Sequence, residues 1–240
     1  MDTFSFIASG LLVYASIAVF VLGMSWRVWQ WARTPASPVR LGIYPKPASR
    51  SGRLGKLLKD TFVAPQSFEI EPRLMVVAMA FHVAALAGFI GHLRLIGEFD
   101  TLVALIGQDG MKVFAAWSGG IVGVVMLACV LYWLARRTFG PYRALSTPED
   151  YLLLALLLGI IIMGNHMRFL GDLPSSVYME WFQSLLAFRP SFPEALAQSS
   201  EKWALNWHML FVSAFLMYFP FSKLTHAIGV FATNLIRSSE

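Results

Sequence analysis

The chain is poor in charged residues and in cysteine. Only 14% of its 240 residues are charged whereas 57% are apolar, a balance that is too apolar for an ordinary water-soluble domain. The single Cys129 excludes a disulfide framework. The sequence also has no glycine-rich phosphate-binding loop, no internal repeat and no hydrolase constellation. The low share of charged residues and the high share of apolar residues indicate a polytopic membrane protein.

Five apolar segments have the length of about 20 residues that an α-helix needs to cross a bilayer. The first segment has an acidic start, Asp2, and lacks the basic region and small-residue cleavage site of a signal peptide, so we expect it to be retained. The predicted fold is all-α: a single membrane domain, residues 1–240, with five transmembrane helices in a bundle. The expected helices are about 4–26, 74–96, 113–135, 151–169 and 204–226.

The basic residues are distributed unequally between the two sides of this bundle. Fourteen of the 19 Lys and Arg residues fall on one side: nine in the loop 27–73, three between the third and fourth segments, and two near the C-terminus. Because cytoplasmic loops carry the excess of Lys and Arg, we expect the N-terminus outside and the C-terminus in the cytoplasm. The pI of about 9.5 then reflects topology and contact with anionic lipid rather than nucleic-acid binding.

Two segments outside the membrane are long enough to carry a function. In the cytoplasmic loop 27–73, we expect the part rich in Pro, Gly and Ser to be extended, and residues 53–65 to form one short amphipathic turn. We interpret this loop as a docking surface for a soluble partner, with a disordered linker as the alternative. On the other side, the apolar run 178–188 contains Trp and Tyr and is expected to form a helix on the outer surface.

Four of the five histidines lie in two apolar segments. His82 and His92 are in the second segment, and His208 and His226 are in the last. A polar ring is costly in a helix of hydrocarbon length, so each needs a reason. The two helices run antiparallel, and residues at equal depth then have position numbers with a nearly constant sum. His82 and His226 sum to 308 and His92 and His208 to 300, whereas the crossed pairs give 290 and 318.

This spacing suits two stacked haem groups near opposite faces of the membrane. At a rise of about 1.5 Å per residue, the histidines lie roughly 15 Å apart on one helix and roughly 27 Å apart on the other. A haem needs only one axial histidine from each helix, whereas zinc needs several ligands around one centre. With one cysteine no CxxCH attachment is present, so both haems are expected to be b-type. The alternatives are hydrogen-bonded polar residues in a bundle, or a helical transporter whose histidines relay protons.

A polar cluster is expected at the outer ends of the second and fourth helices, around the fifth histidine. A quinol head group needs hydrogen-bonding partners for two oxygens and a proton acceptor with a pKa near neutrality, which histidine supplies. The alternative is a set of side chains that snorkel to the interface at helix ends. The candidate quinone-binding residues are His166, Lys112, Arg94, Arg168 and Gly91.

Small residues occur near the candidate haem ligands. The stretch WSGGIVG, residues 117–123, lets another element come close, and we favour helix packing over a cofactor notch. Gly88 and Gly91 flank the histidines of the second helix, and here we favour the close approach of a porphyrin.

Three stretches resemble the gamma subunit of membrane-bound respiratory nitrate reductase, a family of five-helix di-haem cytochromes b. They are FHVAALAGFIGH (81–92), WSGG (117–120) and HMLFVSAFLMYFPFSKLTH (208–226). The resemblance covers about residues 74–230. It implies that His82 and His226 bind the inner haem and that His92 and His208 bind the outer haem. In that family a lysine just before the third helix contributes to quinol binding, and Lys112 lies near that place.

The stretches GHLR (91–94) and GNHMRF (164–169) and the long first loop are more similar to a branch that serves sulfur metabolism. That branch includes the cytochrome b subunit of the complex associated with dissimilatory sulfite reductase and the membrane subunit of heterodisulfide reductase. The resemblance implies menaquinol as substrate, a cytoplasmic iron–sulfur partner subunit, and a place in the cytoplasmic membrane of a bacterium or archaeon. Other membrane or periplasmic subunits and lipid are further expected partners. The chain is then an electron-transfer subunit whose partner performs the substrate chemistry; nitrate respiration is the alternative.

Overall fold

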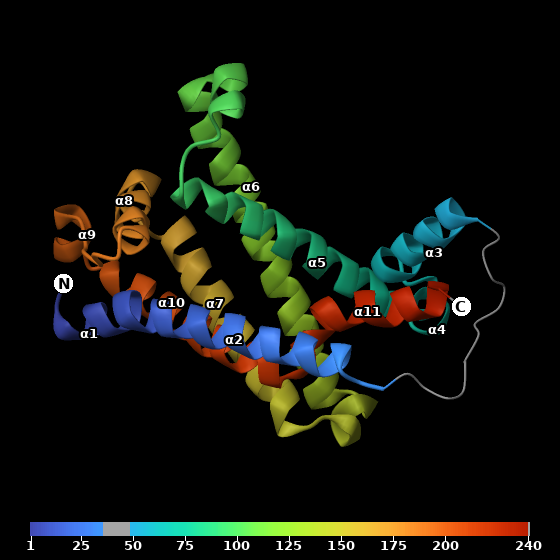
Figure 1. Cartoon of the computed structure of the whole chain (residues 1–240). Helices are drawn as coiled ribbons and strands as arrows, with labels where there is room; N and C mark the ends of the chain where they lie inside the picture. The colour runs from blue at the N-terminus through green and yellow to red at the C-terminus, as the bar shows by residue number, and fades with distance from the viewer. Residues whose placement is uncertain (36–48, 240) are drawn as a thin grey trace. The chain divides into compact units, whose positions relative to one another are not determined.

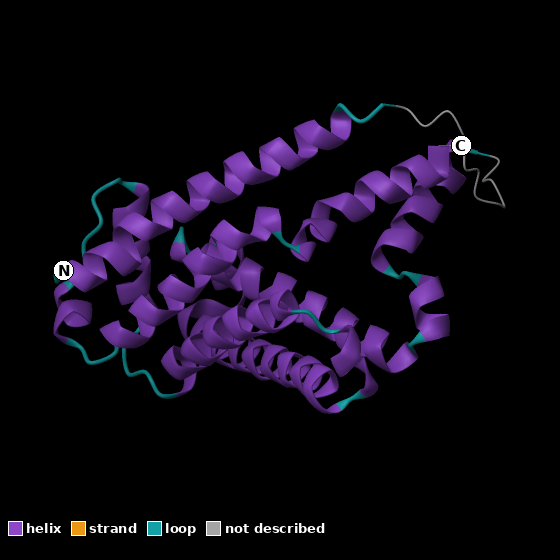
Figure 2. Cartoon of the chain, turned by 90° about the horizontal axis from the view of Figure 1, so that it is seen from below, coloured by secondary structure: helices purple, strands orange, loops and turns teal. Residues whose placement is uncertain are grey.

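The computed structural model describes residues 1–35 and 49–239. Within this part the chain is helical and contains no β-strand (Figure 2). Five helices are long and apolar enough to cross a membrane, which confirms the predicted all-α fold with five spans. The side on which each terminus lies stays a prediction. The five spans are Thr3–Ala32, Pro72–Leu95, Asp100–Phe139, Pro148–Phe169 and Lys202–Phe221.

The chain divides into two compact units. The first comprises Met1–Ala18 and Ala78–Met217, and the second comprises Val19–Val77 and Tyr218–Glu240. The residues of α2 (Leu12–Ala32) and those of α5 (Pro72–His92) are divided between the two units.

In the first unit, α6 (Asp100–Phe139) and α7 (Pro148–Phe169) pack side by side (Figure 1). A Cβ atom on Gly120 would lie 3.2 Å from the Phe169 ring, and one on Gly123 would overlap the Asn165 side chain. Asn165 Nδ2 donates a hydrogen bond to the Gly123 carbonyl oxygen at 3.2 Å. The glycines of the WSGGIVG stretch therefore bring α7 close to α6, which supports the interpretation as helix packing.

The start of α6 differs from the sequence prediction. The third helix was expected to begin at about residue 113, but α6 already begins at Asp100 and is kinked at Gly107, where φ is 74° and ψ is 167°. Glycine adopts this backbone conformation without steric cost because it has no Cβ atom. A 3₁₀ turn (Leu93–Leu95) precedes α6, and a second one (Pro141–Leu145) follows it.

A buried carboxylate holds the turn between α6 and α7. The Asp150 side chain is 6% exposed, accepts a hydrogen bond from the Thr147 backbone N–H at 2.8 Å and pairs with Arg137 at 3.0 Å. Thr147 and Asp150 form a capping box, and Pro148 occupies the first position of α7. These features fix where the fourth span begins.

A polar network joins the N-terminal helix to the last span, also within the first unit. The N-terminal span starts as α1 (Thr3–Phe6) and continues through a π-helical turn, Ile7–Leu11. Ser9 Oγ donates to Asn206 Oδ1 of α10 (Lys202–Tyr218) at 2.7 Å, and Asn206 Nδ2 donates to Ser5 Oγ at 2.9 Å. All three residues are buried, so the network satisfies polar groups that would otherwise be unpaired.

The apolar run that was expected on the outer surface forms a helix, α8 (Ser175–Leu186). Trp181 and Leu185 are buried in a core that also includes Leu196 of the short helix α9 (Glu194–Gln198). Trp181 Nε1 donates to the Ser9 carbonyl oxygen at 3.1 Å. In Figure 1, α8 and α9 lie at the end of the first unit where the chain begins.

In the second unit, the expected helix 204–226 is interrupted. The structure ends α10 at Tyr218, continues with two 3₁₀ turns (Phe219–Phe221 and Lys223–Thr225), and begins α11 (His226–Ser239) at the last histidine. Pro220 provides the physical reason, because proline cannot donate the backbone hydrogen bond that continues a helix. The distance of roughly 27 Å expected between His208 and His226 assumed one continuous helix, so it does not apply to this interrupted segment.

The loop 27–73 is more helical than expected. α2 continues to Ala32, α3 (Arg50–Phe62) replaces the single amphipathic turn, and α4 (Pro65–Ile70) follows. Ser49 caps α3 by accepting the Gly52 N–H at 3.0 Å. α3 lies beside α11 (Figure 1), where Asn234 Nδ2 donates to Thr61 Oγ1 at 3.1 Å. Most of the part expected to be extended, residues 36–48, lies outside the described residues.

Gly23 of α2 provides a test of close packing in the second unit. A Cβ atom there would lie 2.7 Å and 2.8 Å from two carbons of the buried Pro220 ring. We expect Gly23→Ala to destabilise the protein by about 1–3 kcal/mol, because a rigid ring cannot move away from the added methyl group. Thermal unfolding of the purified protein in detergent measures the effect.

Gly55→Ala is the matched control. Gly55 lies inside α3, and a Cβ atom there would meet nothing within 4 Å. Alanine has the higher helix propensity, so this variant should be as stable as the unmodified protein or slightly more stable. Equal melting temperatures for the Gly23 and Gly55 variants would contradict the close approach of α2 to Pro220.

Candidate functional site

Two of the predicted haem ligands, His92 and His208, lie together in the first unit. His92 is the last residue of α5 and His208 lies in the second turn of α10, and the two imidazoles are close enough that a positive charge on one would disfavour a positive charge on the other. His208 Nδ1 is hydrogen-bonded to the Ile160 carbonyl oxygen of α7 at 2.9 Å. A Cβ atom on Gly164 would lie 3.4 Å from the His208 ring, so the glycine leaves room for the imidazole in this orientation. Three spans thus contribute to the placement of this pair.

All four predicted ligands share one hydrogen-bonding pattern. In each, Nδ1 lies within hydrogen-bonding distance of a backbone carbonyl oxygen, which can only accept, so Nδ1 carries the proton and Nε2 has the metal-binding lone pair. Such a bond fixes the tautomer and the ring orientation of a metal-ligating histidine. The pairs are His82 with Ala78 at 2.7 Å, His92 with Gly88 at 2.7 Å, His208 with Ile160 at 2.9 Å, and His226 with Lys223 at 3.0 Å.

This donor set fits the axial positions of haem iron. A Cβ atom on Gly91 would meet nothing within 4 Å, so the face of α5 beside His92 is open to a flat group. The surface at Gly88 is not open, because a Cβ atom there would lie 3.3 Å from Val122 of α6. Gly88 therefore allows close packing of α5 against α6, rather than the porphyrin contact that we expected from the sequence. Among the described residues, no three His, Cys, Asp or Glu side chains gather as they would around a single metal ion.

The second predicted pair, His82 and His226, is divided between the two units. His82 lies in the part of α5 that belongs to the first unit, and His226 is the first residue of α11 in the second. On the first-unit side, the neighbouring Phe81 ring contacts Trp133 of α6 with centroids 4.9 Å apart. The pairing of His82 with His226 stays a prediction.

The predicted quinone-binding residues form a partial cluster around α7. His166 is partly exposed, but its Nδ1 atom is buried and has no hydrogen-bond partner among the described residues. Its ring meets Trp203 edge to face with centroids 4.8 Å apart. Arg168 lies over Gly119 of α6, where its Nη2 atom is 2.7 Å from the position of an added Cβ. The cluster therefore places an imidazole and a guanidinium at the same end of α7.

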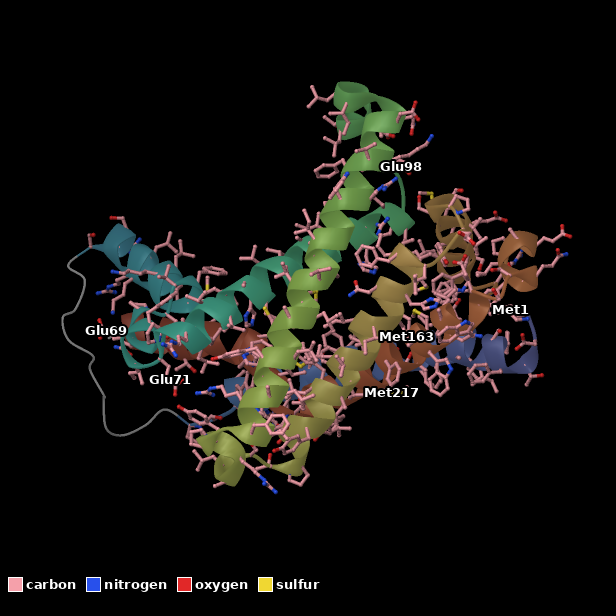
Figure 3. All side chains as sticks on the ribbon, turned by 180° about the vertical axis from the view of Figure 1, so that it is seen from behind. Met1, Glu69, Glu71, Glu98, Met163 and Met217 are labelled. Atoms are coloured by element: carbon pink, nitrogen blue, oxygen red, sulfur yellow. The ribbon has the colours of Figure 1, made fainter. Side chains whose placement is uncertain are left out.

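Arg94 joins this cluster, whereas Lys112 does not. Arg94 is close enough to Arg168 for the two positive charges to repel each other. It forms an ion pair at 2.8 Å with Glu98, which lies in the turn between α5 and α6 (Figure 3). Lys112 pairs at 2.9 Å with Asp109 on its own helix, and the two side chains are 74% and 95% exposed. Within the described ranges, no hydrogen bond or ion pair joins Lys112 to the other quinone candidates.

Glu201, which sequence reasoning missed, organises the segment that leads from α7 to α8. Its side chain accepts hydrogen bonds from the backbone N–H groups of Asp172 and Leu173 and from the Tyr178 hydroxyl at 2.7 Å. Burial and the Glu201 carboxylate raise the pKa of Tyr178, which therefore stays protonated and donates. A Cβ atom on Gly171 would lie 2.6 Å from Glu201 Oε2. The sequence offers one signal for this role: an acidic residue that directly precedes an apolar span.

Comparison with known proteins identifies the family of the chain. The family described as nitrate reductase gamma subunit matches residues 64–239, which include the four predicted ligands. A similar protein from Archaeoglobus fulgidus, named Hdr-like menaquinol oxidoreductase cytochrome b-like subunit, is 29% identical over 258 aligned positions, covering 92% of this chain and 76% of the relative. A protein of the same name from Archaeoglobus profundus is 27% identical over 256 aligned positions, which cover 91% of this chain and 75% of the relative. The chain therefore belongs to the nitrate reductase gamma subunit family.

Proposed function

We propose that the chain is a di-haem cytochrome b subunit that transfers electrons between menaquinol and a cytoplasmic iron–sulfur partner. The observation that carries this proposal is the common pattern of the four histidines, each with Nδ1 bonded to a backbone carbonyl and the metal-binding lone pair on Nε2. All four lie inside the region that matches a membrane cytochrome family. The names of the two relatives support menaquinol as the substrate and favour the sulfur-metabolism branch over nitrate respiration.

His92 and His208 are proposed to hold the haem nearer the quinol, and His82 and His226 the haem nearer the partner. A bound haem supplies a centre that takes up and releases one electron at a time. The protein residues orient it: the bond from each Nδ1–H to a carbonyl fixes the imidazole plane and raises the basicity of Nε2. The polarity around each ligand pair then sets the reduction potential.

At the quinol, His166 is proposed to accept a hydroxyl proton. Oxidation of a quinol to a quinone releases two electrons and two protons. A haem held by His92 and His208 would supply a one-electron acceptor, and the protons need bases at the site. The unpartnered Nδ1 of His166 is a base of this kind, and Arg94 and Arg168 supply hydrogen-bond donors for the quinone oxygens. Gly91 leaves the adjoining face of α5 open, while the exposed ion pair of Lys112 does not support a role for that residue.

An absorption spectrum of the purified protein tests the proposal. We expect b-type Soret and α bands that sharpen on reduction by dithionite, and a pyridine haemochrome assay that gives two haems per chain. Absence of these bands would overturn the haem assignment and leave proton relay through the membrane histidines as the function to examine.

The basic face of α3 is proposed to contribute to docking of the soluble partner. Arg50, Arg53 and Lys59 are exposed, and Lys56 forms an ion pair with Asp60 at 2.9 Å. Replacing all four basic residues by Ala should weaken partner retention by about tenfold at low salt while both haems remain, because rim charges mainly control association. Co-purification at low and high salt measures this effect.

A charge-conserving variant is the control for this experiment. Arg50→Lys and Arg53→Lys together, with Lys56 and Lys59 unchanged, keep the four positive charges and should keep the partner bound. If the fourfold Ala variant retains the partner as well as this control at both salt concentrations, the segment is a linker rather than a docking surface.

A further inference from the structure

The interruption between α10 and α11 leaves one backbone carbonyl without its helical partner. In a regular α-helix, the Pro220 carbonyl would accept the backbone N–H of Leu224. Here the Leu224 N–H donates instead to Ser222 Oγ at 3.1 Å. Arg27 of α2 takes the vacated position, since its Nε atom donates to the Pro220 carbonyl oxygen at 2.8 Å.

α2 is shaped to bring Arg27 to this carbonyl. One turn before Arg27, Gly23 lets the helix backbone approach the Pro220 ring. One turn earlier again, the Phe20 ring meets Phe219 edge to face with centroids 5.3 Å apart. Three consecutive turns of α2 thus contact the interrupted segment, and Arg27 makes the contact nearest the C-terminus of α2.

The Arg27 guanidinium is not engaged by an acid. It is partly buried, and within residues 1–35 and 49–239 no carboxylate pairs with it. A hydrogen bond from an ionised donor is about twice as strong as a neutral one, so a single bond to the Pro220 carbonyl is a substantial restraint. This hydrogen bond restrains the backbone at Pro220, within the interruption between α10 and α11.

The interruption in turn orients His226. The second 3₁₀ turn, Lys223–Thr225, ends directly at His226, and His226 Nδ1 bonds to the Lys223 carbonyl at 3.0 Å. Thr225 Oγ1 donates to the Ser222 carbonyl at 3.2 Å, which ties this turn to the first. A shift of the chain at Pro220 therefore reaches the imidazole through two short hydrogen-bonded turns.

We infer that Arg27 is a positioning residue for His226: by holding the Pro220 carbonyl, it sets the direction in which Nε2 is presented to a haem. This inference rests on the proposed role of His226 as an axial ligand. Arg27 acts through the backbone and does not itself ligate iron. Loss of its donor should alter the ligand geometry of one haem and leave the other unchanged.

Two substitutions of Arg27 separate the hydrogen bond from the charge. The Nε2 atom of glutamine is the same number of bonds from Cα as the Nε atom of arginine, so Arg27→Gln keeps a donor at that position and removes the charge. Arg27→Met keeps a similar chain length and removes the donor. Arg33→Met is the matched control, because Arg33 follows the end of the same helix and lies over the Trp29 ring, 4.4 Å from its centroid.

Electron paramagnetic resonance and redox titration of the purified protein provide the first measurement. The component that belongs to His226 is identified as the one lost in His226→Ala. Arg27→Met should shift the g value and midpoint potential of this component, while Arg27→Gln and Arg33→Met should match the unmodified protein. The inference is overturned if Arg27→Met changes nothing, if it changes the component lost in His92→Ala, or if Arg27→Gln behaves as Arg27→Met does.

Hydrogen–deuterium exchange supplies a measurement that needs no haem. The backbone N–H groups of residues 221–226 should exchange about fivefold faster in Arg27→Met than in Arg27→Gln, as expected for the loss of one hydrogen bond. Equal exchange in the two variants would show that Arg27 does not restrain the interruption. If the unmodified protein shows no b-type bands, the proposed function fails, and the exchange experiment still decides whether Arg27 holds Pro220.

Discussion

Replacing either His92 or His208 by Ala is expected to remove the same spectroscopic component, because the two residues are proposed to clamp one haem. The structure places both in the first unit, close enough that a positive charge on one ring would disfavour a positive charge on the other. A haem with one remaining histidine can persist as a high-spin species, so haem content alone does not measure the effect. Redox titration or electron paramagnetic resonance of each single variant, compared with the double variant, gives the assignment.

The complementary variants decide the pairing of the other two ligands. His82→Ala and His226→Ala should both remove the second component and leave the first. The loss should also be directional: damage at His92 or His208 blocks reduction of both haems by quinol, whereas damage at His82 or His226 leaves one haem reducible. If His92→Ala matched His226→Ala, the crossed pairing would hold, and the expected antiparallel depth match would be abandoned.

Replacing His166 by Ala is expected to slow haem reduction by a menaquinol analogue about 100-fold, the size typical of a lost general base, without removing haem. The reason is the buried Nδ1 atom, for which the described part of the chain supplies no hydrogen-bond partner and which we propose a quinol hydroxyl engages. Stopped-flow absorbance at the haem α band measures the rate. Dithionite reduction of the same sample shows whether both haems are still present.

His166→Asn separates hydrogen bonding from proton transfer. The Oδ1 atom of asparagine occupies nearly the place of Nδ1 and accepts a hydrogen bond, but it does not take up a proton near neutral pH. This variant should bind the analogue with nearly normal affinity and reduce haem slowly. If haem is reduced at the normal rate in both His166 variants, His166 does not take part in quinol oxidation. The alternative then holds, in which His166 is a polar side chain that snorkels to the interface at the end of a helix.

The five spans could be predicted because hydropathy over 20 residues is a local property. The expected second helix, 74–96, differs from Pro72–Leu95 by two residues at most. The ends of other helices depend on more than hydropathy. Residues 100–112 are helical despite their polar side chains, with a kink at Gly107, and Pro220 follows the end of α10 inside an apolar stretch that looks continuous. A hydropathy pattern identifies the apolar stretch but does not reveal these interruptions.

The histidines of the site could also be predicted, because four such rings in apolar spans are rare. Their supporting residues could not. Arg27 is one of nine basic residues in its segment, and only the folded chain places it against Pro220. Gly88 and Gly91 lie three residues apart in one apolar stretch, yet one packs against Val122 and the other faces open space. Such differences depend on partners that are distant in the sequence.

The network of Ser5, Ser9 and Asn206 has a consequence for the order in which the protein assembles during synthesis. Asn206 lies 201 residues after Ser5 and 197 after Ser9, and Trp181 lies 172 residues after Ser9. The first helix therefore enters the membrane long before the ribosome has made Asn206, to which the buried Ser9 hydroxyl donates, and Trp181, which donates to the Ser9 carbonyl oxygen. Unpaired polar groups are costly in lipid, so until then the insertion machinery or water must shield this face. We expect the beginning of the chain to be among the last parts to reach its final position.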